Sequence, residues 1–236
     1  MKTKPESTKG KKVSVPQPKA CRIVLIDDHP LIRQGLSQLL NSQPTLTVAA
    51  SAESAGEGID MVRKHKPDLV ILDLSLPKTD GLEVVKQLKS ELPKLPMLVV
   101  SMHDESVYAE RVLRAGARGY LMKKEPSEKI FEAIAHVLRG DIYVSDRVKR
   151  DMLESSVMGK RAGSEGGSLL DRLTDREFQV FQLLGNGITT KGIAQQLNLS
   201  VKTIETYREN LKVKLNLRTG ADLVQRAIQW SKSQPD

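Results

Sequence analysis

Apolar residues follow two alternating patterns along residues 21–140. Short apolar runs predict strands at residues 22–26, 46–50, 68–72, 97–100 and 118–122. Segments with apolar positions at helical spacing predict helices at residues 31–40, 55–65, 82–91, 106–115 and 127–138. Strands that alternate with helices are typical of βα units on a parallel sheet. This first block is therefore expected to be an α/β domain of five βα units.

The pattern changes after residue 140. Residues 141–168 combine an amphipathic stretch with the segment GKRAGSEGGS (159–168), whose composition is typical of a flexible linker. From residue 169 to 236 only helical patterns remain. The first of these begins at TDRE (174–177), which has the spacing of a capping box, and helices are expected to follow at residues 191–197 and 201–215. A short helix, a turn at residues 198–200 and a longer helix indicate a helix-turn-helix.

Composition limits the class of protein. The chain of 236 residues has room for two domains, contains no apolar run of about eighteen residues, and lacks the apolar region of a secretory signal. A cytoplasmic protein without a membrane partner is expected. The single cysteine, Cys21, excludes an internal disulfide, and the four histidines lack the spacing of zinc ligands.

The net charge of +8 is unevenly distributed. Residues 1–20 hold six Lys and one Glu (+5), residues 21–139 hold 16 basic and 16 acidic residues, and residues 169–236 hold ten basic and seven acidic (+3). The first 20 residues, rich in Lys, Pro and Ser, are expected to form a disordered basic leader. The surplus on the last block is consistent with nucleic-acid binding.

Polar residues follow four of the expected strands directly. In a parallel sheet the carboxyl ends of the strands share one edge, where such folds bind ligands. These residues are Asp27, Asp28, Asp73, Ser101 and Lys123. Three neighbouring carboxylates repel one another unless a cation neutralises them, and Mg²⁺ favours such oxygen ligands. With Lys123 balancing a phosphoryl oxygen and Ser101 donating a hydrogen bond, the group suits phosphoryl transfer onto Asp73.

Each of these residues also has a local interpretation. Asp28 and Ser101 are both types that cap helices, and Lys123 is of a type common on surfaces. The ordered occurrence of an acidic pair, an acid, a hydroxyl and an ammonium on successive strands favours a common site. Asp80-Gly81, by contrast, is more typical of a turn and a helix start.

Four motifs of the first block resemble the receiver domain of bacterial response regulators: VLIDDHP (24–30), LDLSLP (72–77) with DGLE (80–83), VVSMH (99–103) and AGARGYLMK (115–123). The resemblance implies a flavodoxin-like (βα)5 fold with a parallel five-stranded sheet. It implies that Asp73 is the phosphoacceptor, that Asp27, Asp28 and the Ser75 carbonyl hold Mg²⁺, and that Lys123 pairs with the phosphoryl group. Ser101 and Tyr120 would form the switch pair.

The last block has motifs similar to the four-helix LuxR-type DNA-binding domain: LTDREF (173–178), IAQQLNLSVKTI (193–204) and KVKLNL (212–217). A receiver (21–140), a linker (141–168) and this domain (169–236) together resemble the NarL/FixJ class of response regulators. The resemblance implies a transcription factor that binds double-stranded DNA, accepts phosphate from a sensor histidine kinase and forms a homodimer when phosphorylated.

The longer helix of the helix-turn-helix is amphipathic. Ile204, Leu211 and Leu215 mark its buried side, which leaves Lys202, Glu205, Thr206 and Glu209 for a DNA groove. Candidate phosphate contacts are Lys191, Lys202, Thr203, Tyr207, Arg208 and Lys212. The family commonly has His in place of Tyr207 and often basic residues in place of the two glutamates. Glu205 either pairs locally with Arg208 or reads a cytosine, and the second interpretation is favoured; Glu209 is interpreted as pairing locally with Lys212.

Some alternatives remain open. The last helix carries Leu223, Val224, Ala227 and Ile228 at helical spacing, either as plain core or as a dimer contact. The receiver is either switched by phosphorylation or controlled without phosphate. An enzyme resembling the haloacid-dehalogenase phosphatases would require a second Asp where Ser75 stands, so an enzymatic function is not expected.

Overall fold

The computed structural model describes residues 20–76, 79–157, 169–197 and 199–233. The expected leader (except Ala20), the Gly/Ser segment at 159–168 and Asn198 of the expected turn lie outside these ranges. Within them, no helix has the length and apolar character needed to cross a membrane.

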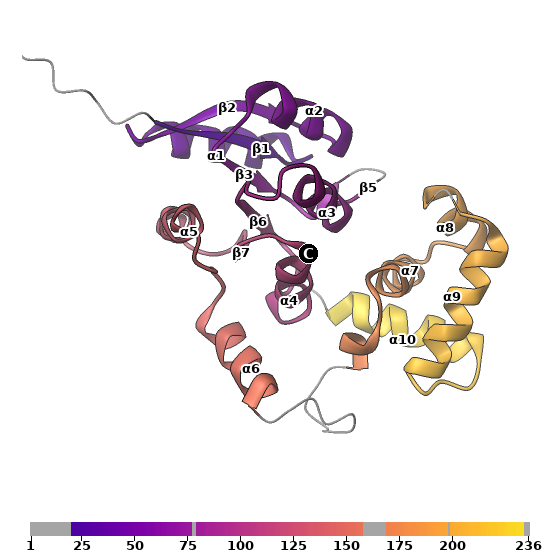
Figure 1. Ribbon diagram of the computed structural model, residues 1–236. Coiled ribbons are helices and arrows are strands. Elements are labelled where there is room, and N and C mark those ends of the chain that lie inside the picture. The colour runs from indigo at the N-terminus through magenta and orange to yellow at the C-terminus, as the bar shows by residue number, and fades with distance from the viewer. Residues whose placement is uncertain (1–19, 77–78, 158–168, 198, 234–236) are drawn as a thin grey trace, which may run out of the picture.

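The N-terminal domain is built on the expected parallel sheet. Its strand order, β2-β1-β3-β6-β7, is the flavodoxin-like order (Figure 1). The strands are β1 (Cys21–Ile26), β2 (Leu46–Ala52), β3 (Leu69–Leu72), β6 (Met97–Ser101) and β7 (Gly119–Met122). A two-stranded antiparallel hairpin, β4 (Ser75–Leu76) with β5 (Thr79–Asp80), was not predicted.

Helices cover both faces of this sheet because successive side chains of each strand point to opposite faces. Val24 and Ile26 face α2, α3 and α4, whereas Ile23 and Leu25 face α1 and α5. All five helices agree with the periodicity to within a residue or two at each end. They are α1 (Pro30–Asn41), α2 (Ala55–His65), α3 (Gly81–Glu91), α4 (Glu105–Ala115) and α5 (Ser127–Arg139).

Packing against this domain continues beyond Gly140, where the sequence places the boundary. Tyr143 pairs with Gly119 of β7, and Val144 and Val148 are buried in the core. Helix α6 (Asp146–Val157) follows and contacts α4. The amphipathic stretch after Gly140 is therefore part of the packed domain.

The C-terminal domain is helical. It consists of a short 3-10 turn, η1 (Leu169–Arg172), followed by α7 (Asp175–Gly185), α8 (Thr190–Gln196), α9 (Val201–Lys214) and α10 (Gly220–Ser233). Thr174 and Glu177 form the expected capping box at the start of α7. Glu177 also accepts a hydrogen bond from Lys214 of α9 at 2.6 Å. Burial alone would raise the pKa of Glu177, but hydrogen bonds from Lys214 and Thr174 hold it below its usual value.

The two domains are in contact. Helix α7 lies beside α3 and α4, while α8 and α9 lie on the side away from the sheet (Figure 1). One cluster of buried apolar side chains runs through both domains, from Val84 and Tyr108 to Phe178 and Phe181. The domains therefore share a continuous packed core.

Gly81, at the start of α3, lies against the backbone of the loop that follows Asp73. A Cβ at this position would stand 2.5 Å from the Leu74 Cα and 2.6 Å from the Asp73 carbonyl oxygen. Since backbone atoms cannot move aside cheaply, Gly81→Ala should lower the free energy of unfolding by about 1–3 kcal/mol in urea denaturation. Gly35→Ala is the control, because Gly35 has no neighbour within 4 Å and alanine favours its helix. Equal stability of the two variants would contradict this close approach.

Candidate functional site

Two buried carboxylates and one ammonium group form the centre of the site. Asp27 follows β1, Asp73 follows β3, and the two strands are hydrogen-bonded neighbours. Lys123 follows β7, and its Nζ lies 2.8 Å from the Asp27 Oδ2 and 2.7 Å from the Asp73 Oδ2. Burial tends to lower the pKa of Lys123, but the hydrogen bonds to both carboxylates outweigh it and the pKa is raised. The lysine therefore stays charged and offsets one of the two negative charges.

The local interpretations of these residues do not apply. Helix α1 has no side-chain cap, so Asp28 does not serve as one. Helix α4 is capped by Asp104 rather than by Ser101. The Lys123 side chain is only 4% exposed and is not a surface lysine. Asp80 does cap α3, accepting a hydrogen bond from the Leu82 amide at 2.9 Å, as the turn interpretation expects.

Oxygen atoms suitable for a cation remain at this cluster. Asp27 uses one oxygen for the His29 amide at 2.8 Å and the other for Lys123. Asp28 Oδ1 and Asp73 Oδ1 are buried without a hydrogen-bond partner, although His29 Nδ1 approaches the former to 2.7 Å. One ligand atom each from Asp27, Asp28, His29 and Asp73 lie within 4.8 Å of one another. These residues fit a hard divalent cation such as Mg²⁺.

Ser101 and Tyr120 meet at a residue that the sequence did not single out. The buried Ser101 Oγ accepts from the His103 amide at 3.5 Å, and the Tyr120 hydroxyl donates to the His103 carbonyl at 2.8 Å. The His103 ring nitrogen Nε2 lies 3.1 Å from the Ser75 Oγ. Burial raises the pKa of Tyr120 and lowers that of His103. The only sequence signal for His103 was its position two residues after Ser101.

Helix α9 separates packing from exposure as its periodicity predicts. Ile204, Leu211 and Leu215 are buried. The four polar residues of the opposite face are all exposed: Lys202, Glu205, Thr206 and Glu209. This face is free for contact with another molecule.

The other candidate DNA contacts differ in their exposure and in the contacts that they already make within the domain. Lys191 is exposed, and Tyr207 packs against the core. Thr203 bonds Ser200 and Arg208 donates to Thr190. Glu209 pairs with Lys212 at 2.8 Å. Glu205, in contrast, has no hydrogen-bond or ion-pair partner among the residues that the structure describes.

Helix α10 divides the four apolar residues of its sequence pattern into two pairs. Leu223 and Ala227 are fully buried in the domain core. Val224 and Ile228 are half-buried and line a shallow groove of about 680 Å³ together with Arg208. Only the second pair is available for contact with another chain.

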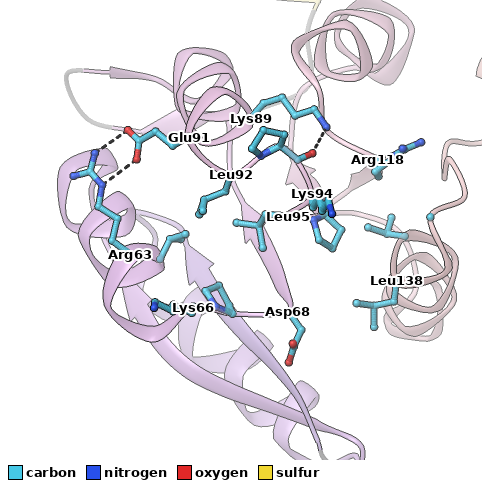
Figure 2. Close-up of a pocket in the computed structure, with 16 residues that line it drawn as sticks. Arg63, Lys66, Asp68, Lys89, Glu91, Leu92, Lys94, Leu95, Arg118 and Leu138 are labelled. Atoms are coloured by element: carbon cyan, nitrogen blue, oxygen red, sulfur yellow. Dashed lines mark hydrogen bonds and ion pairs between the residues drawn. The ribbon is translucent and has the colours of Figure 1, made fainter.

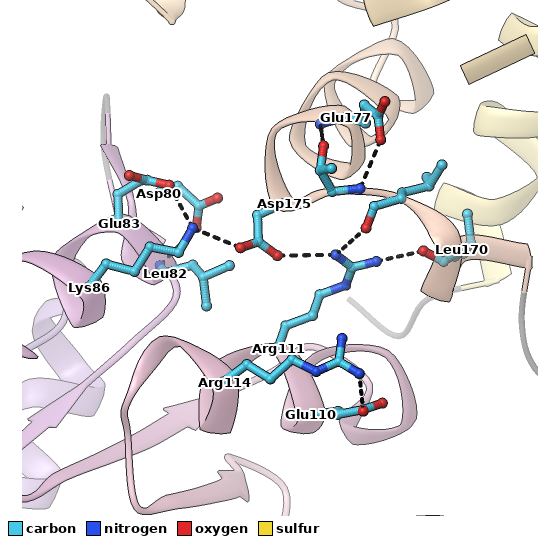
Figure 3. A network of polar contacts seen from close by, with 12 residues as sticks. Asp80, Leu82, Glu83, Lys86, Glu110, Arg111, Arg114, Leu170, Asp175 and Glu177 are labelled. Atoms are coloured by element: carbon cyan, nitrogen blue, oxygen red, sulfur yellow. Dashed lines mark hydrogen bonds and ion pairs between the residues drawn. The ribbon is translucent and has the colours of Figure 1, made fainter. Parts of the chain in front are cut away.

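Three charged residues that the sequence did not single out join the two domains. Asp175, at the start of α7, pairs with Lys86 of α3 at 2.7 Å and with Arg111 of α4 at 3.2 Å (Figure 3). Lys86 and Arg111 precede Asp175 by 89 and 64 positions, and no spacing rule connects them to it.

A groove of about 1320 Å³ lies at the opposite edge of the sheet, where β3 and β6 begin (Figure 2). An ion pair between Arg63 and Glu91 borders one side. Leu92 and Leu138 are exposed in it to 38% and 40%. Because it opens at the amino ends of the strands, it contributes no residue to the acidic cluster.

Two families match the chain. Residues 23–135 match the response regulator receiver domain, and residues 171–227 match the bacterial regulatory proteins of the luxR family. The chain is 35% identical over 211 residues to the oxygen regulatory protein NreC of Staphylococcus haemolyticus, covering 88% of this chain and 96% of that protein. It is 32% identical over 225 residues to the transcriptional regulatory protein DegU of Brevibacillus brevis, covering 89% and 95%.

Solved structures have the same fold. RcsB from Salmonella enterica serovar Typhimurium, determined bound to a promoter in the presence of a phosphomimetic, superimposes with a TM-score of 0.68 at 24% identity, over 88% of this chain and 98% of that one. A LuxR-family two-component response regulator from Aurantimonas gives a TM-score of 0.55 at 32% identity, over 59% and 99%.

Removing the ammonium group tests the centre of the site. Lys123→Met leaves Asp27 and Asp73 buried without a cation, so the free energy of unfolding should fall by about 3 kcal/mol, the lower end for a broken buried pair. Urea denaturation in EDTA measures this. Lys124→Met is the matched control. Lys124 is the next residue in the chain, and its side chain is exposed and makes no ion pair among the described residues. An equal effect of both substitutions would show that Lys123 does not hold the carboxylates.

Proposed function

Because the chain belongs to the response regulators, transcription regulators that join a receiver domain to a LuxR-type DNA-binding domain, we propose that phosphorylation of Asp73 by a partner histidine kinase is its switch. Members of this class are DNA-binding regulators and not enzymes. The observation that carries the proposal is the buried Asp73 carboxylate, with one oxygen held by Lys123 and the other without a partner.

The transfer would use groups already in position. The Asp73 carboxylate attacks the phosphorus of a phosphohistidine, the P–N bond breaks, and the imidazole leaves with the electron pair and takes up a proton. Lys123 can neutralise an oxygen of the arriving group, and the Ser101 hydroxyl can donate a hydrogen bond to another. Positioning and charge neutralisation would provide the rate enhancement.

A divalent cation completes the proposal. Asp28 and Asp73 each offer a buried oxygen that accepts no hydrogen bond, the Ser75 carbonyl is a further candidate ligand, and Asp27 supports the site through His29 and Lys123. Bound Mg²⁺ would supply charge neutralisation between these carboxylates and the phosphoryl oxygens. We accordingly propose Mg²⁺ as the cofactor.

The output is proposed to be binding of double-stranded DNA by α9, as a dimer joined through α10. The exposed polar face of α9 would enter the major groove, with Lys191, Lys202, Thr203, Tyr207, Arg208 and Lys212 near the phosphates. Val224 and Ile228 would form the two-fold contact. The DNA-bound structure of RcsB supports this comparison at the level of fold.

Substituting the phosphoacceptor tests the switch. Asp73→Asn should fold normally and take up no acid-labile phosphate from acetyl phosphate with Mg²⁺, measured by intact mass. Asp60→Asn, an exposed carboxylate on α2, should label like the wild type. If Asp73→Asn labels at the wild-type rate, the site assignment fails; if no form labels but DNA is bound, a receiver controlled without phosphate is favoured.

Phosphorylation should promote a symmetric dimer that binds two half-sites about one helical turn apart. Light scattering at micromolar concentration should show that the phosphorylated wild type is a dimer and that the phosphorylated Ile228→Ala variant dimerises more weakly. Arg226→Ala, an exposed residue of α10 that does not line the groove, is the control. A phosphorylated wild type that stays monomeric and binds DNA no better would refute this step.

Glu205 should read one base pair. A carboxylate accepts a hydrogen bond from the cytosine amino group, so Glu205→Ala should relax the preference at one operator position by roughly 1–3 kcal/mol. Non-specific binding should strengthen slightly, since a negative charge near phosphate is lost. Binding-site selection measures both, and Glu209→Ala is the control because Glu209 already pairs with Lys212. An unchanged consensus for Glu205→Ala would overturn the assignment.

A further inference from the structure

The groove at the amino ends of β3 and β6 carries a local surplus of positive charge (Figure 2). Among the described residues that line it, five are basic and two acidic, whereas residues 21–139 as a whole hold 16 of each. The basic residues are Arg63, Lys66, Lys89, Lys94 and Arg118. The surplus is therefore a property of this surface and not of the whole domain.

Two of these cations are not explained by the helices that end nearby. Basic side chains in the last turn of a helix complement the helix dipole, and Arg63 and Lys89 are of this kind. Lys94 and Arg118 instead lie in the loops that lead into β6 and β7. Both residues are exposed, and their side chains form no ion pair or hydrogen bond with any residue that the structure describes. Their charges are free to pair with another molecule.

The two carboxylates of the groove already have partners. Glu91 accepts two hydrogen bonds from Arg63, at 2.8 and 3.0 Å, and this pair ties the end of α2 to the end of α3. Asp68 accepts a hydrogen bond from the Arg22 amide at 2.8 Å. Because the Arg63–Glu91 pair removes one charge of each sign, the positive surplus remains.

Apolar side chains lie between these charges. Leu92 and Leu95, from the loop after α3, lie on one side of the groove and Leu138 of α5 lies on the other (Figure 2). Pro93 and Pro96 restrict the backbone of this loop, and the Lys89 Nζ donates to the Pro93 carbonyl at 2.7 Å. A loop that is held in shape before a partner arrives lowers the ordering cost of binding.

The size and the lining of the groove restrict what it can bind. Its volume of about 1320 Å³ exceeds the roughly 300–1,000 Å³ of typical small-molecule sites. Proteins commonly hold single-stranded nucleic acid by stacking its bases on aromatic rings, and none of the described lining residues is aromatic. The basic leader at residues 1–20 has the same sign of charge as the groove and is repelled by it. These properties favour an acidic polypeptide from another molecule.

We propose that this groove docks an acidic segment of a partner protein that also carries leucine-like side chains. Carboxylates of the segment pair with Lys94 and Arg118, and its apolar side chains cover Leu92 and Leu138. Apolar burial provides the affinity, and charge complementarity selects and orients the segment. Because the groove lies at the edge of the sheet opposite Asp73, this contact goes beyond the proposed function and does not require phosphorylation.

The first test measures binding of a defined probe to the full-length, unphosphorylated protein. The probe is a short fluorescein-labelled peptide with leucines at helical spacing and glutamates elsewhere; its matched peptide has lysines in place of the glutamates. Fluorescence anisotropy should show binding of the acidic peptide only. Lys94→Glu and Arg118→Glu should each bind it about tenfold more weakly, because like charges then face each other.

The control for this charge reversal is Lys64→Glu, which should bind the acidic peptide like the wild type. Lys64 is exposed on α2 beside Arg63 but does not line the groove, and its substitution changes the net charge equally. Asp73→Asn should also bind like the wild type, since Asp73 lies at the other edge of the sheet. Uptake of phosphate from acetyl phosphate, measured by mass, should be unchanged in Lys94→Glu and Arg118→Glu.

The second test concerns the apolar part of the groove. Leu138→Ser should weaken binding of the acidic peptide about fivefold, the effect of a modest interface contact. Because Leu138 is already exposed, urea denaturation should show little change in stability. Leu153→Ser is the control, since Leu153 is an exposed leucine of α6 outside the groove.

The other outcomes each refute the inference. If the acidic peptide does not bind, or binds no better than the basic one, the groove has no preference for acidic segments. If Lys94→Glu and Arg118→Glu bind it as tightly as Lys64→Glu, the peptide lies elsewhere on the chain. If a single-stranded oligonucleotide binds more tightly than the peptide and Lys94→Glu weakens it, the occupant is nucleic acid. If the unphosphorylated wild type self-associates in light scattering and Lys94→Glu does not, the occupant is a second copy. Failure of the wild type to take up phosphate would contradict the proposed function alone.

Discussion

The ion pairs that Lys123 makes with both Asp27 and Asp73 are the constraint on which the receiver edge depends. Two carboxylates that are each only 2% exposed lose most of their hydration, and an ammonium within 2.8 Å offsets part of that cost. The arrangement requires β1, β3 and β7 to end on the same edge, which the parallel order provides. It also leaves one oxygen of Asp73 buried without a hydrogen-bond partner, and the proposed phosphorylation would use this carboxylate.

Few residues connect this edge of the sheet to the second domain. His103 is the junction, since Ser101, Tyr120 and Ser75 all contact it. Beyond it, the aromatic and cationic side chains of α4 enter the core of the DNA-binding domain. The contacts that α4 makes with α7 and with the turn before it determine how the two domains sit.

The DNA-binding domain keeps the buried apolar side chains and the exposed polar side chains of α9 on opposite sides of the helix. Glu177 closes the first turn of α7 and also holds Lys214, so the start of one helix and the end of another are fixed together. The buried stripe of α9 then orients its polar face outward. A rigid support of this kind allows a small domain to present side chains to a groove without reorganising.

The sequence by itself determined the elements and the edge on which the site lies. Helix and strand periods, capping residues and the position of Asp27, Asp73 and Lys123 after apolar runs are local properties of the chain. The β4–β5 hairpin escaped prediction because strands of two residues have no period to detect. Only the tertiary structure decided the contacts of His103 and Arg111, whose partners lie 28 and 62 positions away, because packing rather than spacing brings such side chains together.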